Sequence, residues 1–556
     1  MYVKKLFQES IRCFQTHNNR TNFPKRYVIK FVFVGAVGCM PVFYYTSLND
    51  RKKRQIQINI GGIERFFRSA IIGLVISVDY WWSLRRFEEN SKLYLEYIET
   101  VHQRSAERIA QCCLKNGGLY IKLGQGLVNL DHLLPKQYTQ TLKILQDKCL
   151  VRKENEIVQL FQEDFGVPYT EIYESFNEQP IAAASLAQVF KARTKDGVDV
   201  AVKAQYIDLR DRFNGDIATV KFLLKCAGRL FPNYNFEWIL NELHTPLELE
   251  LDFSLEGKNT EKCSKDLAHL GYVYVPKVYW DKSSKRILTT EFIDGIKINE
   301  TETLQKENYS LVDIDTKLFK TFAEQIFHTG FIHADPHPGN ILVRRSKDGS
   351  AQLVLLDHGL YETLPSNLRI SLTNLWRAIV MNNHTDMKKY STELGIDGND
   401  YRLFCIALAQ RYVPTEHNDD QDLLKWFFNL KGSLVTSALN NLTKENKENK
   451  RKIKAEAEKI QEQLMNIFQR LPGKLLLVCR NLNTVRSIAR IHGNLVDRHS
   501  IMAHCAVQHI FSKSSIKKFH HQIMFEMKLW FDKIKRFFLK YIFRWFQSSG
   551  SIDGFV

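Results

Sequence analysis

The sequence predicts an α+β protein with two lobes, a helical N-terminal extension and a helical C-terminal tail. Short β-rich segments are concentrated between residues 156 and 295, which we assign to a first lobe. Mainly helical segments follow from 296 to 500, and a charged loop interrupts them near the start of this second lobe. Strands followed by helices are typical of α+β folds. Helical patterns over 84–155 and 501–556 predict the extension and the tail.

The composition is that of a globular protein with a basic excess. The 556 residues include 78 Lys and Arg against 61 Asp and Glu, a formal charge of +17, and 44% are hydrophobic. These values exclude a wholly disordered, a collagen-like or a disulfide-scaffold protein. The ten cysteines are scattered and form no Cys-x-x-Cys pair, which argues against structural zinc.

The N-terminus predicts targeting and a membrane crossing. Residues 1–30 are rich in Lys and Arg and contain Glu9 as their single acid, which resembles a mitochondrial import segment, with a basic tail as the alternative. Residues 31–48 carry no charge and would span about 27 Å as a helix, with a buried helix as the alternative. We therefore expect a single-pass protein of the inner mitochondrial membrane. A second apolar run, 70–82, is too short to cross and contains Asp79, so we interpret it as core or interfacial.

The tail is both aromatic and basic. From Ile523 to Trp545 apolar side chains recur at three- and four-residue steps, with Lys and Arg between them. This pattern is typical of a helix that lies among lipid headgroups, although packing on the protein's own surface fits equally well. Because no nucleic-acid-binding module accompanies it, we expect membrane lipid and no nucleic acid as a partner.

Two β-hairpins are predicted around charged turns. Their turns lie at Asp196–Gly197 and at Asp348–Gly349, each between two β-rich runs. Two further β-rich segments, YVYVPKVYW and RILTTEFIDG, would complete a small sheet with the first hairpin.

The charged loop IHADPHPGN and the following LLDHGL carry groups that phosphoryl transfer requires. The reaction needs a carboxylate that orients the attacking hydroxyl, and oxygen ligands that hold Mg²⁺ on the phosphates. Asp335, Asn340 and Asp357 follow one another in the order in which protein kinases carry these groups. We predict Asp335 as the catalytic base and Asn340 and Asp357 as metal ligands.

Two upstream residues strengthen this interpretation. Lys203 ends the run VAVK, like the kinase lysine that holds the α- and β-phosphates of ATP. Glu256 lies in the helical region that follows, where the ion-pair partner of that lysine belongs. We count Lys203 and Glu256 with Asp335 as the catalytic set, and we expect ATP or ADP with Mg²⁺ as cofactors.

The expected nucleotide loop contains alanines in place of glycines. In IAAASLAQV, Ala182, Ala184 and Ala187 align with the three glycines of the kinase loop, and Val189 aligns with its valine. The alanine Cβ restricts both positive φ and the approach of backbone amides to phosphate. The loop is therefore predicted to hold the nucleotide in a different pose.

Taken together, these motifs resemble the UbiB family of atypical kinases, called aarF-domain-containing kinases in animals. The resemblance covers about residues 99–497 and rests on KLGQ, AAASLAQV, VAVK, ELDF, HADPHPGN and LLDHGL. It implies an atypical protein-kinase-like fold in which the K-x-G-Q helix lies over the active site. Lys122 and Gln125 would then point toward the nucleotide and toward Glu250 or Asp252. Some members are associated with coenzyme Q or other prenyl lipids, which implies proteins of prenyl-lipid biosynthesis as partners.

Three functions remain open from the sequence. The first is an atypical ATP-dependent kinase or ATPase. The second is a nucleotide-responsive lipid-binding scaffold without phosphoryl transfer, which the occluding Lys122 helix would favour. The third is a small-molecule phosphotransferase, because the pattern His-x-Asp-x-His-x-x-Asn also occurs in such enzymes. In LLDHGL, His358 replaces the phenylalanine of the kinase Asp-Phe-Gly motif and is expected to be packed or hydrogen-bonded.

Overall fold

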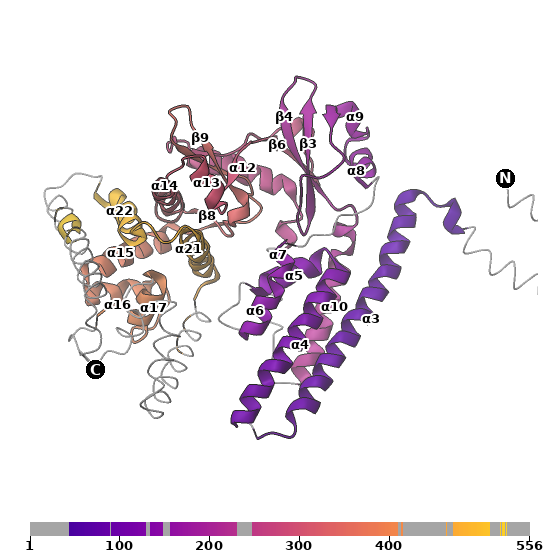
Figure 1. Ribbon diagram of the computed structural model, residues 1–556, viewed down its shortest axis with the longest axis horizontal. Helices are drawn as coiled ribbons and strands as arrows, with labels where there is room; N and C mark the ends of the chain where they lie inside the picture. Colours follow the sequence, from indigo (N-terminus) through magenta and orange to yellow (C-terminus); the bar gives the residue numbers. More distant parts are fainter. Residues whose placement is uncertain are drawn as a thin grey trace, which may run out of the picture.

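Two lobes and a helical body make up the structure, a computed structural model (Figure 1). It describes residues 44–88, 91–128, 134–147, 156–230, 247–409 and 471–511, together with a few isolated positions. The predicted two-lobed α+β fold with a helical N-terminal extension is confirmed.

The small lobe is built on a five-stranded antiparallel sheet of order β1-β3-β4-β6, in which β2 pairs with β3. Val200 and Val202 of β4 enter the core between sheet and helices, whereas Lys203 lies on the opposite side of the strand. The elements are β1 (Tyr173–Phe176), β2 (Ala182–Ala183), β3 (Ala187–Thr194), β4 (Asp199–Gln205), β6 (Ile287–Glu291), α8 (Glu156–Phe165), α9 (Tyr169–Ile172), η2 (Trp280–Lys282) and α12 (Phe253–Asp266).

The large lobe carries the predicted catalytic loop on short strands. Helix α14 continues into the π-helical η3, which ends at Gly330 with a φ of 70°. Strand β8 follows at once and pairs with β11, so the loop after β8 begins at a fixed point. The elements are α13 (Thr301–Lys306), α14 (Leu311–Ala323), η3 (Glu324–Thr329), β8 (Phe331–His333), η4 (Pro338–Asn340) and β11 (Tyr361–Thr363).

A second sheet of order β5-β10-β9-β7 completes this lobe. Its strands are β5 (Val273–Tyr274), β7 (Ile296–Lys297), β9 (Ile341–Arg345) and β10 (Ala351–Leu355). Both predicted hairpins are confirmed, with Gly197 and Gly349 at φ values of 77° and 82° in their turns. The segment YVYV was assigned to the wrong sheet, because β5 pairs in parallel with β10 and not with the small-lobe strands.

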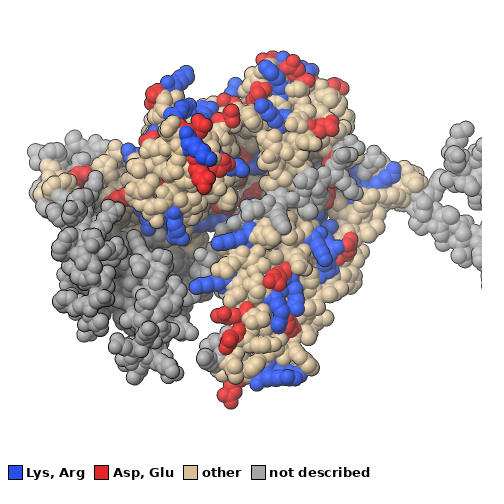
Figure 2. Space-filling model, in the orientation of Figure 1, with Lys and Arg blue, Asp and Glu red and all other residues tan. Residues whose placement is uncertain are grey.

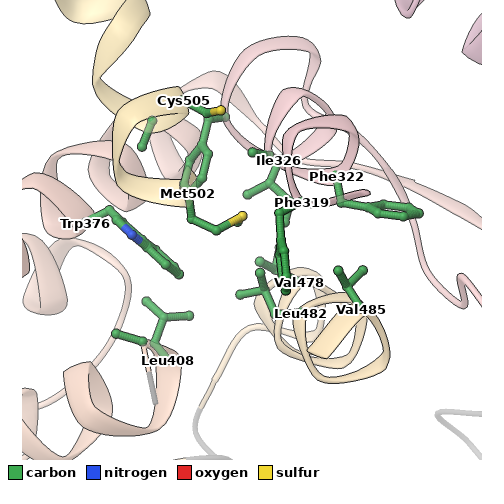
Figure 3. Packing of buried hydrophobic residues seen from close by; sticks show 14 of the residues in the cluster. Phe319, Phe322, Ile326, Trp376, Leu408, Val478, Leu482, Val485, Met502 and Cys505 are labelled. Carbon is green, nitrogen blue, oxygen red and sulfur yellow. The ribbon is translucent and has the colours of Figure 1, made fainter. Parts of the chain in front are cut away.

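Helices from distant parts of the sequence close the core of the large lobe. Phe319 of α14 lies against Val478 and Leu482 of α21, and Met502 of α22 lies between Phe319 and Trp376 of α15 (Figure 3). Burial of such large apolar side chains is the main contribution to the stability of the folded lobe. The helices are α15 (Ser366–Met381), α16 (His384–Glu393), α17 (Tyr401–Ala409), α21 (Gly473–Ile491) and α22 (Arg498–Phe511).

The helical extension packs on a helix that the chain adds between β4 and α12. This helix, α10, lies along α3 and contacts α5 (Figure 1). A buried network joins them, in which Asp216 of α10 accepts hydrogen bonds from Arg65 of α3 at 2.8 Å and from Arg212 at 2.9 Å. The helices are α3 (Asp50–Leu84), α4 (Lys92–Asn116), α5 (Leu119–Val128), α6 (Lys136–Leu142), α7 (Ile144–Asp147) and α10 (Leu209–Leu230).

The predicted membrane crossing is contradicted. Within the described ranges, no helix is both long and apolar enough to cross a membrane. Helix α3 is long, but Arg65, Arg68 and Asp79 occupy one of its sides. The single-pass prediction is therefore wrong. Residues 1–43, with the predicted import segment and most of the predicted span, lie outside the described residues, as does most of the tail after 511.

Candidate functional site

Three charged residues from separate segments meet between the lobes. The Lys203 ammonium on β4 lies 2.6 Å from Oε1 of Glu256 on α12 and 3.5 Å from Oδ1 of Asp357, which follows β10. In the sheet, Lys203 is held on both sides by β4 pairing with β3 and β6. This is the arrangement that the sequence predicts for the phosphate-binding lysine and its partner.

The shared ammonium sets the charge of both carboxyl groups. Burial alone would raise the pKa of Asp357, but Lys203 reverses this effect and holds that pKa well below its usual range. Burial raises the pKa of Glu256 to about 7 against the attraction of Lys203. Asp357 is therefore the ionised carboxylate of the site, and Glu256 is the first of the two to take up a proton.

The two predicted metal ligands are adjacent. The Asn340 amide donates a hydrogen bond to Oδ2 of Asp357 at 3.0 Å, and the backbone N–H of Gly359 donates to Oδ1 at 3.0 Å. No group of three His, Cys, Asp or Glu side chains suited to a metal occurs in the described part of the chain. An oxygen pair fits Mg²⁺, which takes few protein ligands and completes its shell with phosphate oxygens and water. The Asp357 carboxylate and the Asn340 amide oxygen would hold it.

Asp335 is held by an arginine that the sequence analysis missed. Nη2 of Arg480 on α21 donates to Oδ2 of Asp335 at 2.9 Å, and the neighbouring Asn481 amide donates to the His333 carbonyl oxygen at 2.7 Å. Helix α21 therefore fixes the loop that carries the predicted base. Arg480 follows Asp335 by 145 residues and belongs to no local motif, so the sequence contains no signal for this pair.

The motif K-x-G-Q lies on α5 and reaches the site through its lysine. Nζ of Lys122 lies 2.6 Å from Oε2 of Glu250, and both side chains are largely buried. Burial would lower the pKa of Lys122, but Glu250 outweighs this effect and the carboxylates of Asp335 and Asp357 add to it, so the pKa is raised. Lys122 is therefore within electrostatic reach of the predicted base and metal ligand.

Gln125 and Asp252, which the family resemblance also directs to the site, have partners elsewhere. The Gln125 amide donates to the Leu145 carbonyl oxygen at 2.8 Å, away from the two acids to which the family resemblance directs it. Asp252 is the N-cap of α12, where its Oδ1 accepts a hydrogen bond from the backbone N–H of Ser254 at 3.0 Å. It thereby fixes the start of the helix that carries Glu256.

The alanine-rich loop is a tight hairpin. Ala182 of β2 pairs with Val189 of β3, and the backbone N–H of Ala184 donates to the Ala187 carbonyl oxygen at 2.7 Å. Ala182 and Ala184 are exposed, whereas Ala187 is fully buried. In the described chain the non-glycine residues with positive φ are Asn308, Asn382 and Asn494, so the loop needs no glycine conformation.

His358 is a neutral packing residue. Burial lowers its pKa to about 3, so one ring nitrogen can donate and the other can accept. Nε2 lies 3.0 Å from the Leu355 carbonyl oxygen and Nδ1 lies 2.9 Å from the Tyr361 hydroxyl. Both partners suit the neutral ring, as expected for a packed or hydrogen-bonded side chain.

Gly124 allows α5 to approach its neighbour. A Cβ at this position would lie 2.2 Å from Cδ1 of Leu145, which is fully buried. We expect Gly124→Ala to lower the thermal midpoint by an amount equivalent to about 1–3 kcal/mol, because the overpacking exceeds the gain in helix propensity. Gly73→Ala in α3 is the matched control: its Cβ meets nothing within 4 Å, so it should stabilise by ~0.5–1 kcal/mol. Equal effects of the two changes would contradict this account of α5 packing.

Comparisons with known proteins identify relatives of this chain. A family model described as the ABC1 atypical kinase-like domain matches residues 144–391. AarF domain-containing protein kinase 1 of Mus musculus is 40% identical over 351 residues, which are 63% of this chain and 67% of the mouse protein. A putative ABC1 protein of Arabidopsis thaliana is 32% identical over 484 residues, 84% of this chain and 86% of that protein.

A third relative is longer. Probable serine/threonine-protein kinase abkD of Dictyostelium discoideum is 39% identical over 455 residues, which are 82% of this chain but only 62% of that protein. From segments such as NGGLYIKLGQGL we expected the fifth member of the animal set, whereas the mouse relative is numbered 1, so the assignment is made to the family and not to one member. The chain belongs to the ABC1 family of atypical kinases, which is also known as the UbiB or aarF-domain-containing family.

Proposed function

We propose that the protein is an ATP- or ADP-binding, Mg²⁺-dependent atypical kinase or ATPase. The observation that carries this proposal is the convergence of three segments on one ammonium group. The carboxylates of Glu256 and Asp357 lie within 3.5 Å of the Lys203 ammonium. Ion pairs in proteins can serve stability alone. This one lies beside Asn340 and the loop that carries Asp335, so it is next to the other groups that phosphoryl transfer requires.

Each side chain has one role in this proposal. Lys203 binds the α- and β-phosphates, and Glu256 orients it. Asp357 and Asn340 hold Mg²⁺, which neutralises charge on the transferred phosphoryl group when it is bound. Asp335 accepts the proton of the attacking hydroxyl or water, with Arg480 fixing its carboxylate. The hairpin with Ala182, Ala184 and Ala187 covers the phosphates.

The position of Lys122 favours a small acceptor. Lys122 of α5 pairs with Glu250, and the charges of Asp335 and Asp357 add to the rise in its pKa, so this side chain faces the predicted site. A folded protein would have to displace α5, whereas water or a small molecule would not. The term serine/threonine-protein kinase in the name of the Dictyostelium relative keeps a protein acceptor as the alternative.

A nucleotide-responsive scaffold without phosphoryl transfer is the second candidate. It is favoured by the engagement of Asp335 with Arg480, which leaves the carboxylate less available as a base. Family resemblance extends the proposal to prenyl-lipid metabolism and its proteins. Comparing the lipids of cells that carry the wild type or Asp335→Asn would test this link, since a role in that pathway requires changed prenyl-lipid levels.

The substitution Asp335→Asn tests the enzyme directly. It removes the proton acceptor but leaves Lys203, Asn340 and Asp357 in place, so phosphate release from ATP should fall about 10²–10⁴-fold. The nucleotide-induced rise in thermal midpoint with Mg²⁺ should persist. Asp348→Asn is the matched control, because Asp348 is exposed in the β9–β10 turn and should keep full activity. Wild-type turnover by Asp335→Asn would favour the scaffold.

A further inference from the structure

The outward side of α3 carries a long apolar stripe, which the exposed Glu64 interrupts near its start. Nine large apolar side chains on it are between 43% and 63% exposed, and they recur at three- and four-residue steps over about 33 Å of helix. We call this set the α3 stripe; it consists of Ile60, Ile63, Phe67, Ile71, Leu74, Val75, Val78, Trp81 and Trp82. Single exposed apolar residues are normal on a protein surface, but a stripe of this length indicates an interaction site.

Three charged residues along α3 face the protein instead of the solvent, whereas the polar residues Gln55, Gln57, Asn59 and Glu64 nearer its start are exposed. Arg65 pairs with the buried Asp216 of α10, and Arg68 donates to the Asn116 side chain at 2.7 Å. Asp79 accepts from Arg104 of α4 at 2.8 Å. A surface helix of a water-soluble protein has the opposite arrangement, with its apolar side on the core. This inverted polarity shows that the apolar side of α3 is adapted to surroundings other than water.

The α3 stripe has basic side chains at both ends. Arg51 and Lys52 are exposed before it, and Arg85 and Arg86 are exposed after it. The Arg85 guanidinium lies 3.6 Å from the ring centre of Trp82. Figure 2 shows a mostly uncharged edge along α3, with Lys and Arg near its upper end and at the lower tip of the helical hairpin. Trp and Arg side by side are typical of the boundary between acyl chains and headgroups.

Neighbouring helices extend the same surface. Phe222 of α10 is 53% exposed, and its ring centre lies 6.0 Å from that of Phe66 on α3. Leu93 and Tyr97 at the start of α4 are also exposed, next to the end of α3. Among the described elements α4 and α10 pack most extensively on α3, and Tyr138 of α6 and Glu163 of α8 add single contacts, while the stripe residues stay exposed (Figure 1).

We propose that α3 lies in the plane of an anionic lipid surface, with the α3 stripe among the acyl chains and its basic ends at the headgroups. A stripe of apolar and aromatic residues with flanking Lys and Arg has the chemistry for this contact. The proposal goes beyond the nucleotide chemistry and does not depend on it.

A second copy of the chain fits the α3 stripe less well. Parallel pairing of two α3 helices would place each basic end beside the same end of the other copy, and antiparallel pairing would place Arg51 and Lys52 beside Arg85 and Arg86. Like charges meet in both cases, whereas an anionic surface meets opposite charge at both ends of the helix. Charge complementarity therefore selects the lipid surface.

The test is co-sedimentation of the full chain with vesicles of phosphatidylcholine alone or mixed equally with phosphatidylserine. The wild type should bind the mixed vesicles more tightly, and added salt should weaken this binding. Leu74→Glu with Val78→Glu places two charges in the α3 stripe and should reduce binding to the mixed vesicles about tenfold or more. Gln55→Glu with Asn59→Glu is the matched control, because it adds the same charge to exposed polar positions of the same helix.

Further readouts separate the possible outcomes. Without vesicles, the stripe variant should keep the wild-type helical circular dichroism and thermal midpoint, because both substituted side chains are exposed. Arg85→Gln with Arg86→Gln should reduce the preference for the anionic vesicles. Equal vesicle binding by the stripe variant and its control would overturn the proposal. So would a wild-type dimer in sedimentation velocity that the stripe substitutions convert to a monomer while vesicle binding stays unchanged.

Discussion

Replacing Lys203 by Met is expected to abolish turnover and also to destabilise the protein. The ammonium is shared by Glu256 and Asp357, so its removal leaves two neighbouring carboxyl groups without their cation. Breaking one side of such a pair costs about 3–5 kcal/mol of unfolding free energy, because an uncompensated charge stays behind. Loss of the phosphate-binding cation should lower the rate of ATP turnover by ~10³-fold or more. Phosphate release and thermal unfolding measure the two effects.

A second substitution separates the loss of activity from the loss of stability. Glu256→Gln in the Lys203→Met background removes the buried charge of the partner and should restore much of the lost stability while activity stays absent. Lys191→Met is the matched control, because Lys191 lies on the neighbouring strand β3, is 43% exposed and pairs with Asp199 at the surface. Normal turnover by folded Lys203→Met would show that this lysine does not bind the nucleotide phosphates.

Breaking the ion pair between Lys122 and Glu250 should release α5 from the site. Lys122→Met leaves the Glu250 carboxylate, which is only 14% exposed, without its cation. We expect a loss of about 3 kcal/mol in unfolding free energy and faster amide hydrogen exchange in α5. Glu250→Gln alone should have a comparable effect, and the double variant should be less destabilised than the sum of the two.

A double-mutant cycle measures this coupling through thermal unfolding. A coupling energy of about 1–3 kcal/mol is expected for a largely buried pair in contact. Lys136→Met is a suitable control, since Lys136 begins the neighbouring helix α6 and is exposed. Additive effects of Lys122→Met and Glu250→Gln would mean that the pair does not hold α5 in place.

The parts of the fold that depend on short-range chemistry could be predicted from the sequence. The turns at Gly197 and Gly349 need positive φ, and a glycine between two β-rich runs signals this locally. Strand β5 could not be assigned to its sheet, because its two residues pair with β10, which lies about 80 residues away. The predicted crossing at residues 31–48 was wrong: within the described ranges no helix is long and apolar enough to span a membrane, and most of residues 31–48 lies outside these ranges.

In the candidate site, too, the residues within local motifs could be predicted, and those placed by long-range folding could not. Lys203, Asn340 and Asp357 belong to motifs whose spacing predicts their roles, and Glu256 was expected from its place in the helical region after Lys203. The structure brings the four side chains together. Arg480 was missed because only the folding of α21 onto β8 places it next to Asp335. Gln125 was directed to the site by family resemblance, but its side chain faces the α7 segment.

In the described part of the chain, the cations Lys203, Lys122 and Arg480 around the candidate site already have internal counterions. Lys203 is neutralised by Glu256 and Asp357, Lys122 by Glu250, and Arg480 by Asp335. A polyphosphate that enters must exchange places with carboxylates and cannot simply fill an open positive cleft. Association should therefore be slower than diffusional encounter, and the protein is protected from capturing whichever polyanion reaches it first.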